Sequence, residues 1–502
     1  MLKNLRVSIS IILFALLTFY FLDISAVLPD RFHVLAEIQL VPAILSGSFI
    51  ILAALIILTI FFGRVYCSSI CPMGIYQDIV SWFSKRKMFS KKKKRYKYSK
   101  AKNILRWSVL GITIVTFFLN LPLFLGLVDP YSAYGRMITN VFKPVYMGGN
   151  NVLESIFTSF GNYTFYKVEI VILSLFAFIV GIVTFLAIGF LAWKYGRTYC
   201  NTICPVGTVL GFLSKYSFFK PVIDTEKCNG CGVCARNCKA SCINSKEHKI
   251  DYSRCVTCMD CIDKCRQGAI RYVPRQKEES LTDKQTTENI DKSGVSRRNF
   301  LSVTALLASA TALKAQKIKV DGGLAVIEDK KIPNRTTPIT PAGSQSARNL
   351  AQHCTACQLC VSVCPNQVLR PSDNLEKLMQ PEMSYERGYC RPECTRCSDI
   401  CPTGAIRSVT KADKSAIQIG HAVWIKKNCV VNTDAVECGN CARHCPVGAI
   451  QMIPIDAKNK DSLKIPAVNT ERCIGCGACE NLCPARPFSA IYVEGHEIHR
   501  TV

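Results

Sequence analysis

The chain has 502 residues, which is too long for one ordinary domain. Its 29 cysteines are too many for a typical enzyme, and the chain is too long for a secreted disulfide scaffold. The cysteines are therefore predicted to be metal ligands. Its formal charge of +26 would suggest nucleic acid as a partner of a soluble protein. Much of this basic excess lies in one segment beside a long apolar stretch, so we expect membrane lipid and no nucleic acid.

Four apolar stretches near the N-terminus are each long enough to cross a bilayer as a helix. They cover residues 5–22, 40–62, 104–128 and 168–193. The connection 84–106 holds twelve Lys or Arg residues and no acid, so the positive-inside rule places it in the cytoplasm. We therefore predict an all-α membrane domain of four transmembrane helices over residues 1–220, with the N-terminus inside.

The second and fourth predicted spans end in nearly the same twelve residues. Residues 63–74 read GRVYCSSICPMG and residues 196–207 read GRTYCNTICPVG, with eight identical positions. This repetition predicts two parallel repeats of two helices each. Each pair of cysteines, at i and i+4, is predicted to face one side of a helix that the following proline stops. The thiols are candidates either for another metal centre or for two redox dithiols, and they belong to Cys67, Cys71, Cys200 and Cys204.

Two cysteine quartets with the spacing C-x2-C-x2-C-x3-C follow, in a predicted two-cluster ferredoxin domain over residues 221–274. In such runs three thiolates hold one [4Fe–4S] cubane and the fourth reaches the neighbouring cluster. The predicted ligand sets are Cys228, Cys231, Cys234 and Cys265, and Cys255, Cys258, Cys261 and Cys238. Cys242 is left over and is interpreted as a packed thiol, with a spare ligand as the alternative.

A polar linker is predicted over residues 275–295. Next comes Ser296-Arg297-Arg298-Asn299-Phe300-Leu301, which opens a twin-arginine-like segment over residues 296–316. We predict that this segment is a fifth, short membrane crossing. The alternatives are an ordinary amphipathic helix with a chance Arg297-Arg298 pair and a cleavable signal. A second linker is predicted over residues 317–348.

Four more quartets occupy residues 349–502, a predicted four-cluster ferredoxin domain. Zinc sites use two pairs of ligands with a spacer between them, whereas these quartets are compact, so about six [4Fe–4S] clusters are expected in the chain. Gly-Ala-Ile sequences at Gly268, Gly404 and Gly448 predict short strands, and the ferredoxin domains are predicted to be α+β. The ligands here are Cys354, Cys357, Cys360, Cys364, Cys390, Cys394, Cys397, Cys401, Cys429, Cys438, Cys441, Cys445, Cys473, Cys476, Cys479 and Cys483.

Two further features of the sequence bear on redox chemistry. Lys239 and Arg266 follow the last cysteines of the first two quartets, where the other four have proline. A cation beside a cluster favours its reduced state, which predicts higher potentials there. All seven histidines lie outside the four predicted spans, so no membrane haem is expected.

The four spans, the motifs Cys67–Pro72 and Cys200–Pro205, and the two-cluster ferredoxin together resemble the NapH family, with NosR-like and MauN-like relatives. Residues 296–502 resemble NapG or MauM, four-cluster ferredoxins that follow a twin-arginine signal, so the chain looks like a NapH–NapG fusion with an internal signal. The resemblance implies quinol oxidation and electron delivery to a periplasmic partner. It also implies that the first C-terminal quartet exchanges its last cysteine with the fourth and the second with the third, so that Cys364 joins Cys473, Cys476 and Cys479, and Cys401 joins Cys429, Cys438 and Cys441.

We therefore predict a multi-pass electron-transfer subunit of the inner (cytoplasmic) membrane, with residues 221–274 cytoplasmic and residues 349–502 periplasmic. It would pass electrons from the quinone pool or a cytoplasmic donor to a periplasmic reductase or cytochrome. No motif for bond chemistry on a metabolite is recognisable in the sequence. The alternatives are a metal-reducing assembly or maturation factor, and a redox sensor, for a respiratory metalloenzyme.

Overall fold

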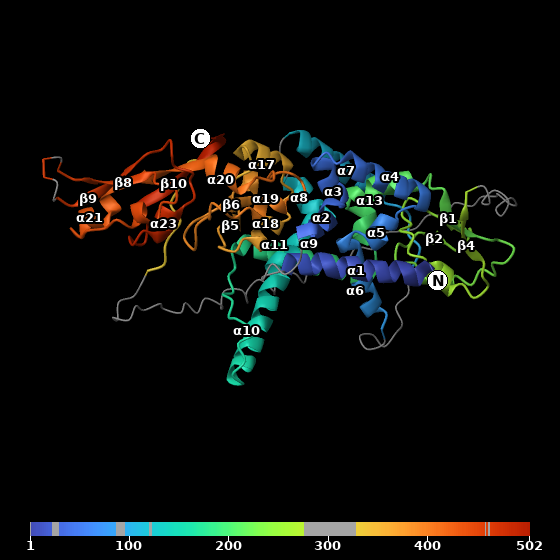
Figure 1. Ribbon diagram of the computed structural model, residues 1–502. Coiled ribbons are helices and arrows are strands. Elements are labelled where there is room, and N and C mark those ends of the chain that lie inside the picture. The colour runs from blue at the N-terminus through green and yellow to red at the C-terminus, as the bar shows by residue number, and fades with distance from the viewer. Residues whose placement is uncertain are drawn as a thin grey trace, which may run out of the picture.

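The computed structural model describes residues 2–22, 30–86, 96–119, 123–275, 328–456, 458–459 and 462–501. Its helices gather in a central bundle, and a smaller module with short strands lies at each end of that bundle (Figure 1). The predicted twin-arginine segment, with Arg297 and Arg298, lies outside the described residues.

The bundle is built on apolar helices whose outer surfaces remain exposed. α1 (Leu2–Leu22) and α11 (Leu175–Tyr195) are continuous, and by length and composition they are the two described helices that could cross a membrane. The other two predicted spans are interrupted. One consists of α3 (Leu40–Leu45) and α4 (Phe49–Phe62), and the other of α7 (Asn103–Phe118) and α8 (Leu123–Val128). At the first break Gly47 has a φ of 69°, which ends the α3 turn.

Two pairs of short helices fold back after α4 and α11, and they carry the repeated motif. The first pair is α5 (Val65–Ser69) and α6 (Pro72–Ser84), and the second is α12 (Thr198–Thr202) and α13 (Pro205–Ser214). Each proline follows the end of one helix and also begins the next, because the first turn has no use for the N–H that proline lacks. The prediction that both cysteines of a motif lie on one helix is wrong, since the second cysteine is the N-cap of the following helix.

The remaining helical elements of the bundle lie before α3 and after α8. They are η1 (Asp30–His33), α2 (Val34–Glu37), α9 (Pro130–Met137), the π-helical η2 (Ile138–Phe142) and α10 (Lys143–Ser159). The Asp129 side chain caps α9 by accepting a hydrogen bond from the Ser132 amide. α10 projects sideways out of the bundle (Figure 1).

The two-cluster module packs against the end of the bundle where α1 begins. It pairs β1 (Phe219–Ile223) with β4 (Ile270–Pro274) and β2 (Ile243–Asn244) with β3 (Lys249–Ile250), and its helices are α14 (Val233–Asn237) and α15 (Asp260–Lys264). Lys3 of α1 donates to Asp263 at 2.8 Å, and the Phe218 amide donates to the Ile60 carbonyl at 2.7 Å. Because β1 already begins at Phe219, the module starts slightly before the predicted boundary.

The four-cluster module packs against the opposite end of the bundle. Its antiparallel pairs are β5 (Leu369–Pro371) with β6 (Pro381–Met383), β7 (Ile417–Trp424) with β10 (Ile491–Thr501), and β8 (Ile450–Pro454) with β9 (Lys464–Val468). Its helical elements are α17 (Ala347–His353), α18 (Leu359–Val363), η3 (Leu375–Lys377), α19 (Arg396–Asp399), α20 (Lys411–Ala416), η4 (Lys426–Asn428), α21 (Val430–Thr433), α22 (Asn440–Arg443) and α23 (Ala478–Leu482).

Two details of this module differ from the sequence-based expectation. Strands follow Gly268 and Gly448 as predicted, as β4 and β8, but the residues after Gly404 form bends instead of a strand. Part of the predicted second linker is structured: Arg335 forms an ion pair with the buried Glu480 at 2.5 Å, and Ser346 pairs with Ile498. The module therefore includes residues 328–346.

Polar contacts fix the four-cluster module to the bundle. Asn140 donates to Gln358 at 2.6 Å, and Ser174 donates to Asp373 at 2.7 Å. At Gly135 of α9 a Cβ would lie only 2.4 Å from the Cys357 carbonyl oxygen, so the backbones approach too closely for any side chain. The two ferredoxin modules are thus held at opposite ends of one helical bundle.

Candidate iron–sulfur centres and the core of the bundle

The thiols of the two-cluster module gather in two pockets, as the spacing predicts. Each pocket is lined by three cysteines of one quartet and the last cysteine of the other. The first is lined by Cys228, Cys231, Cys234 and Cys265, and the second by Cys255, Cys258, Cys261 and Cys238. The structure thus brings together the thiols of each predicted ligand set of this module.

In the four-cluster module the quartets pair differently from the prediction. Cys364 lines a pocket with Cys390, Cys394 and Cys397, and Cys483 lines one with Cys429, Cys438 and Cys441. Cys401 is close enough to Cys354, Cys357 and Cys360 to interact with them electrostatically. Cys445 is in the same way close to Cys473 and Cys476, which are both close to Cys479.

The pairing of the first quartet with the fourth and the second with the third is thus wrong. The first exchanges with the second, and the third with the fourth. The physical reason is local packing: α18 contacts α19, and α22 contacts α23, so quartets that are neighbours in sequence face each other.

These thiol pockets fit the groups that the spacing predicts. Four thiols converge from two segments in each, which is the ligand set of a [4Fe–4S] cluster. Such a cluster, when bound, accepts and donates single electrons. The protein supplies the thiolates and surrounds them with buried side chains, since many of the ligand cysteines lie in the same buried clusters as core leucines and isoleucines.

Two further side chains lie next to the ligand thiols. Lys414 is buried on α20, and its Nζ donates to Cys390 Sγ at 3.2 Å. Cys242 is 1% exposed, and its Sγ lies 3.5 Å from Cys238 Sγ. Lys414 could not be recognised in the sequence as a neighbour of a cluster, because its contact with Cys390 spans 24 residues. Cys242, which the sequence offered as a packed thiol or a spare ligand, lies four residues after Cys238 and against its sulfur.

The side chain of Lys239 is less free than the sequence suggested. Its Nζ forms ion pairs with Asp78 of the bundle at 3.2 Å and with Asp260 at 3.0 Å. Two carboxylates offset the one positive charge that was expected to raise the potential of the neighbouring cluster. Lys239 instead connects the two-cluster module to the bundle.

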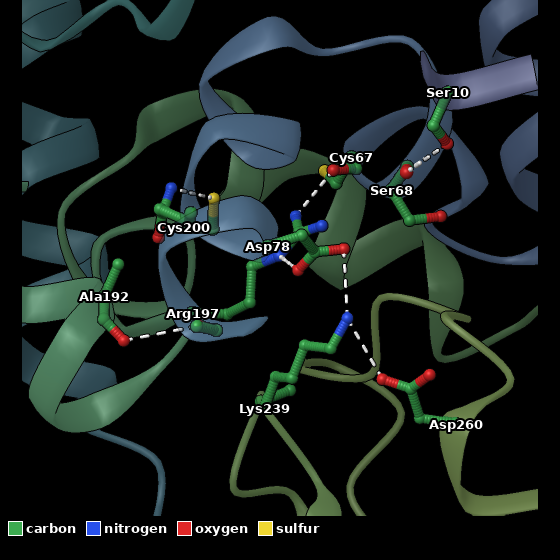
Figure 2. Close-up of polar contacts among 12 residues, drawn as sticks. Ser10, Cys67, Ser68, Asp78, Ala192, Arg197, Cys200, Lys239 and Asp260 are labelled. Carbon is green, nitrogen blue, oxygen red and sulfur yellow. Dashed lines mark hydrogen bonds and ion pairs between the residues drawn. The ribbon is translucent and has the colours of Figure 1, made fainter. Parts of the chain in front are cut away.

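Figure 2 shows the centre of this connection, with Arg197 and Lys239 both reaching Asp78 close to Cys67 and Cys200. The Arg197 Nε donates to Asp78 at 2.8 Å, and its Nη1 donates to the Cys67 carbonyl at 2.6 Å. Burial alone would raise the pKa of Asp78, but the cations Arg197, Lys239 and Arg6 outweigh it and hold the pKa of this carboxyl well below its ordinary value. Asp78 is therefore a fixed negative charge among three cations.

The structure brings together the four cysteines of the repeated motifs in the bundle core. They are at most 4% exposed and share one buried cluster of side chains. Among the described residues, no group of three or more His, Cys, Asp or Glu side chains is arranged to bind a single metal ion. The thiols of the ferredoxin modules are included among these residues.

Family models match both halves of the chain. One described as a 4Fe-4S binding domain matches residues 46–92 and 175–224, which are the two motif repeats. Another, described as a 4Fe-4S dicluster domain, matches residues 353–430 and 435–486. The first of the latter two ranges holds the first two quartets and Cys429, and the second holds the cysteines from Cys438 to Cys483. No solved structure gives a significant match.

Individual relatives match parts of the chain. An uncharacterized protein of Methanocaldococcus jannaschii, MJ0749, is 38% identical over 18% of the chain and 34% of its own length. The putative electron transport protein YccM of Escherichia coli is 22% identical over 45% of the chain and 55% of its length. The chain thus spans about a third of one of these two relatives and about half of the other. The methylamine utilization ferredoxin-type protein MauM of Methylobacillus flagellatus is 31% identical over 32% of the chain and 70% of its length.

Repeated thiol pockets in ferredoxin-like modules, together with these matches, define a polyferredoxin, an iron–sulfur electron-transfer protein that carries several [4Fe–4S] clusters. Its N-terminal part is of the NapH and YccM kind. The chain belongs to the family of ferredoxin-type proteins that includes MauM.

Proposed function

We propose that this polyferredoxin moves electrons across a membrane, from a quinol pool or a cytoplasmic donor to a reductase or cytochrome on the far side. The observation that carries the proposal is the position of the two ferredoxin modules at opposite ends of one apolar bundle. The described ends of the basic loop support the same orientation, since Lys85 and Tyr96 both contact the backbone of the two-cluster module. That module would then be cytoplasmic, and the four-cluster module would be outside.

The ligand sets lie in a series that suits this role. Cys258 interacts with Lys239 at the bundle, whereas Cys231 of the other N-terminal set is exposed. At the opposite end the set that includes Cys357 and Cys401 lies against Tyr131 of α9. The remaining three sets follow outward, and the Cys390 amide donates to the Cys476 carbonyl where two of them meet.

The sidedness is tested by reporter fusion. A reporter active only outside the cytoplasm, fused after the last residue, is expected to be active, and a cytoplasmic reporter at the same point inactive. The opposite pattern would place both modules on one side and overturn the crossing model. Substitution of Arg297-Arg298 by Lys-Lys then tests whether the twin-arginine-like segment is needed for export.

Electron flow is tested in sealed vesicles that contain the purified chain. Fast, stoichiometric oxidation of added quinol with reduction of an enclosed cytochrome supports an electron-transfer subunit. Slow flux accompanied by loss of a metal centre in a partner oxidase would support the maturation factor instead.

A further inference from the structure

The four thiols of the two membrane motifs form one group. Cys71 is close enough to Cys67 and Cys200 to interact with both electrostatically, and Cys204 interacts in the same way with all three others. Each repeat supplies two of the four, so the site exists only when the repeats pack together. All four lie in the same buried core.

Both repeats present their sulfur atoms to hydrogen-bond donors in the same way. The Gly207 amide donates to Cys204 Sγ at 3.3 Å, and the Gly74 amide donates to Cys71. Gln77 Nε2 adds a bond to Cys200 Sγ at 3.1 Å. A Cβ at Gly74 or Gly207 would lie 2.2 or 2.1 Å from the Cys67 or Cys200 carbonyl oxygen. Backbone N–H bonds to sulfur are a means by which proteins tune iron–sulfur clusters.

A buried cation in this core lacks an acidic partner. Arg64 is 0% exposed, and its donors reach the Asn201 side chain at 2.8 Å, the Ser253 and Cys200 carbonyls, and Cys67 Sγ at 3.7 Å. In the described part of the chain no carboxylate pairs with it, and its Nε has no partner. The equivalent Arg197 has Asp78. A buried charge without a counter-charge costs free energy of folding. A negatively charged group bound by the thiols would compensate the charge of Arg64.

The set of four thiols lies between the two ferredoxin modules. On one side, Arg64 reaches the Ser253 carbonyl, two residues before Cys255. On the other side, Tyr66 and Tyr199 interact with the thiols and with Asp129, and Tyr131 interacts with Asp129 and Cys357. A redox centre here would fill the space between the innermost ligand sets of the two modules.

We propose that Cys67, Cys71, Cys200 and Cys204 together hold one iron–sulfur cluster, with Arg64 as its counter-cation, which connects the two ferredoxin modules. This inference rests on the electron-transfer function proposed above. Assembly converts four thiols to thiolates and releases four protons. In turnover the cluster accepts one electron from the two-cluster module and donates one electron to the four-cluster module. The oxidation state of its iron changes by one unit each time, and no bond to the protein breaks. An oxidised cubane with four thiolates carries a charge of about −2, which the Arg64 guanidinium partly offsets.

The test is the iron and acid-labile sulfide content of the purified full-length chain in detergent. A seventh [4Fe–4S] cluster gives about 28 of each, and a [2Fe–2S] cluster gives about 26; either supports the proposal. Cys67→Ala and Cys204→Ala should then fall to about 24, whereas the control Thr202→Ala, in the same motif but with its hydroxyl donating to the Thr198 carbonyl, keeps the wild-type content. A wild-type content of about 24, unchanged in Cys67→Ala, would overturn the proposal and leave two dithiols.

A second variant keeps the proposal testable even where the cysteine variants fail to fold. Arg64→Gln should retain the wild-type iron content and shift one EPR signal to a more negative potential, with Arg64→Lys in between. Unchanged potentials for all signals in Arg64→Gln would exclude the counter-cation role. Iron content does not depend on sidedness, so an inactive outside reporter together with 28 iron atoms would refute the crossing and leave the cluster standing.

Discussion

At the scale of single residues, the surroundings of the ligand thiols decide how the otherwise similar sites differ. The cysteines themselves follow from the sequence because a cubane requires four thiolates at short spacing. Their polar neighbours do not, because these come from distant parts of the chain. Lys414 is one such neighbour, whereas Cys242 is a local one, four residues after Cys238; each leads to a prediction.

Substitution of Lys414 by Met is expected to lower the potential of the cluster bound by Cys364, Cys390, Cys394 and Cys397. The Lys414 ammonium donates to Cys390 Sγ, and a nearby cation favours the more negative, reduced state. A charge-assisted hydrogen bond is worth about 1.5 kcal/mol, which is about 60 mV for one electron. EPR-monitored redox titration measures the shift. Lys411→Met, on the exposed side of the same helix, is the control, and equal titrations for the two variants would contradict the prediction.

Cys242→Ala is expected to leave the iron content unchanged and to make one N-terminal potential more negative. The Cys242 thiol is a buried S–H group 3.5 Å from Cys238 Sγ, and loss of a donor to a ligand sulfur destabilises the reduced state. The effect should be smaller than that of Lys414→Met, because the donor is neutral. Loss of about four iron atoms would instead identify Cys242 as a ligand.

At the scale of elements, the two pairs of folded-back helices place the repeated motif in the core of the bundle. Gly63 and Gly196, with φ of 72° and 73°, end α4 and α11, and Pro72 and Pro205 begin α6 and α13. Such interruptions of a membrane helix are tolerated where protein buries the backbone. α6 is then held in place by its one acidic residue, Asp78.

Asp78→Asn is expected to destabilise the chain by about 3 kcal/mol or more, because it leaves Arg197 buried without its carboxylate and Lys239 with Asp260 alone. Since the pKa of Asp78 is lowered in the folded chain, its contribution is present above the ordinary value of 3.8. It is lost as the pH falls below that value. Thermal unfolding in detergent should therefore separate wild type and variant at pH 5–8, with the difference shrinking below about pH 4. The control Asp263→Asn removes an exposed pair with Lys3 and should change little.

The sequence predicts an element well where residues close together in the chain determine it, and poorly where packing between distant segments does. The length of the apolar segments predicted α1 and α11. The spacing of the cysteines from Cys228 to Cys265 predicted which thiols lie together in the two-cluster module. The helix ends at Leu45 and Phe118 were missed, because hydrophobic length alone does not show whether an apolar segment forms one helix or two. The quartet pairing was wrong because it depends on which short helices face each other, which the spacing does not encode.

At the scale of the whole molecule, the bundle has to hold two ferredoxin modules so that their innermost ligand sets face its core. On the side of the two-cluster module this is done by charge, through the ion pair of Lys239 with Asp78 of the bundle. On the outer side it is done by close backbone packing at Gly135 and by the bond from Asn140 to Gln358. The four thiols of the membrane motifs lie in the buried core between these two contacts.

Gly135→Ala should weaken the outer contact without removing any ligand. Its Cβ would meet the Cys357 carbonyl oxygen at 2.4 Å and the Phe21 ring at 2.9 Å, and overpacking of this kind costs about 1–3 kcal/mol. Because the Cys357 loop would have to move away from α9, we expect the iron content of the wild type but slower electron transfer. When the clusters of the two-cluster module are reduced rapidly, those of the four-cluster module should be reduced more slowly than in the wild type. Stopped-flow absorbance measures this rate. The control is Gly149→Ala on α10, where a Cβ meets nothing within 4 Å, and it should transfer electrons at the wild-type rate. Wild-type kinetics in Gly135→Ala would mean that electrons do not pass through this contact.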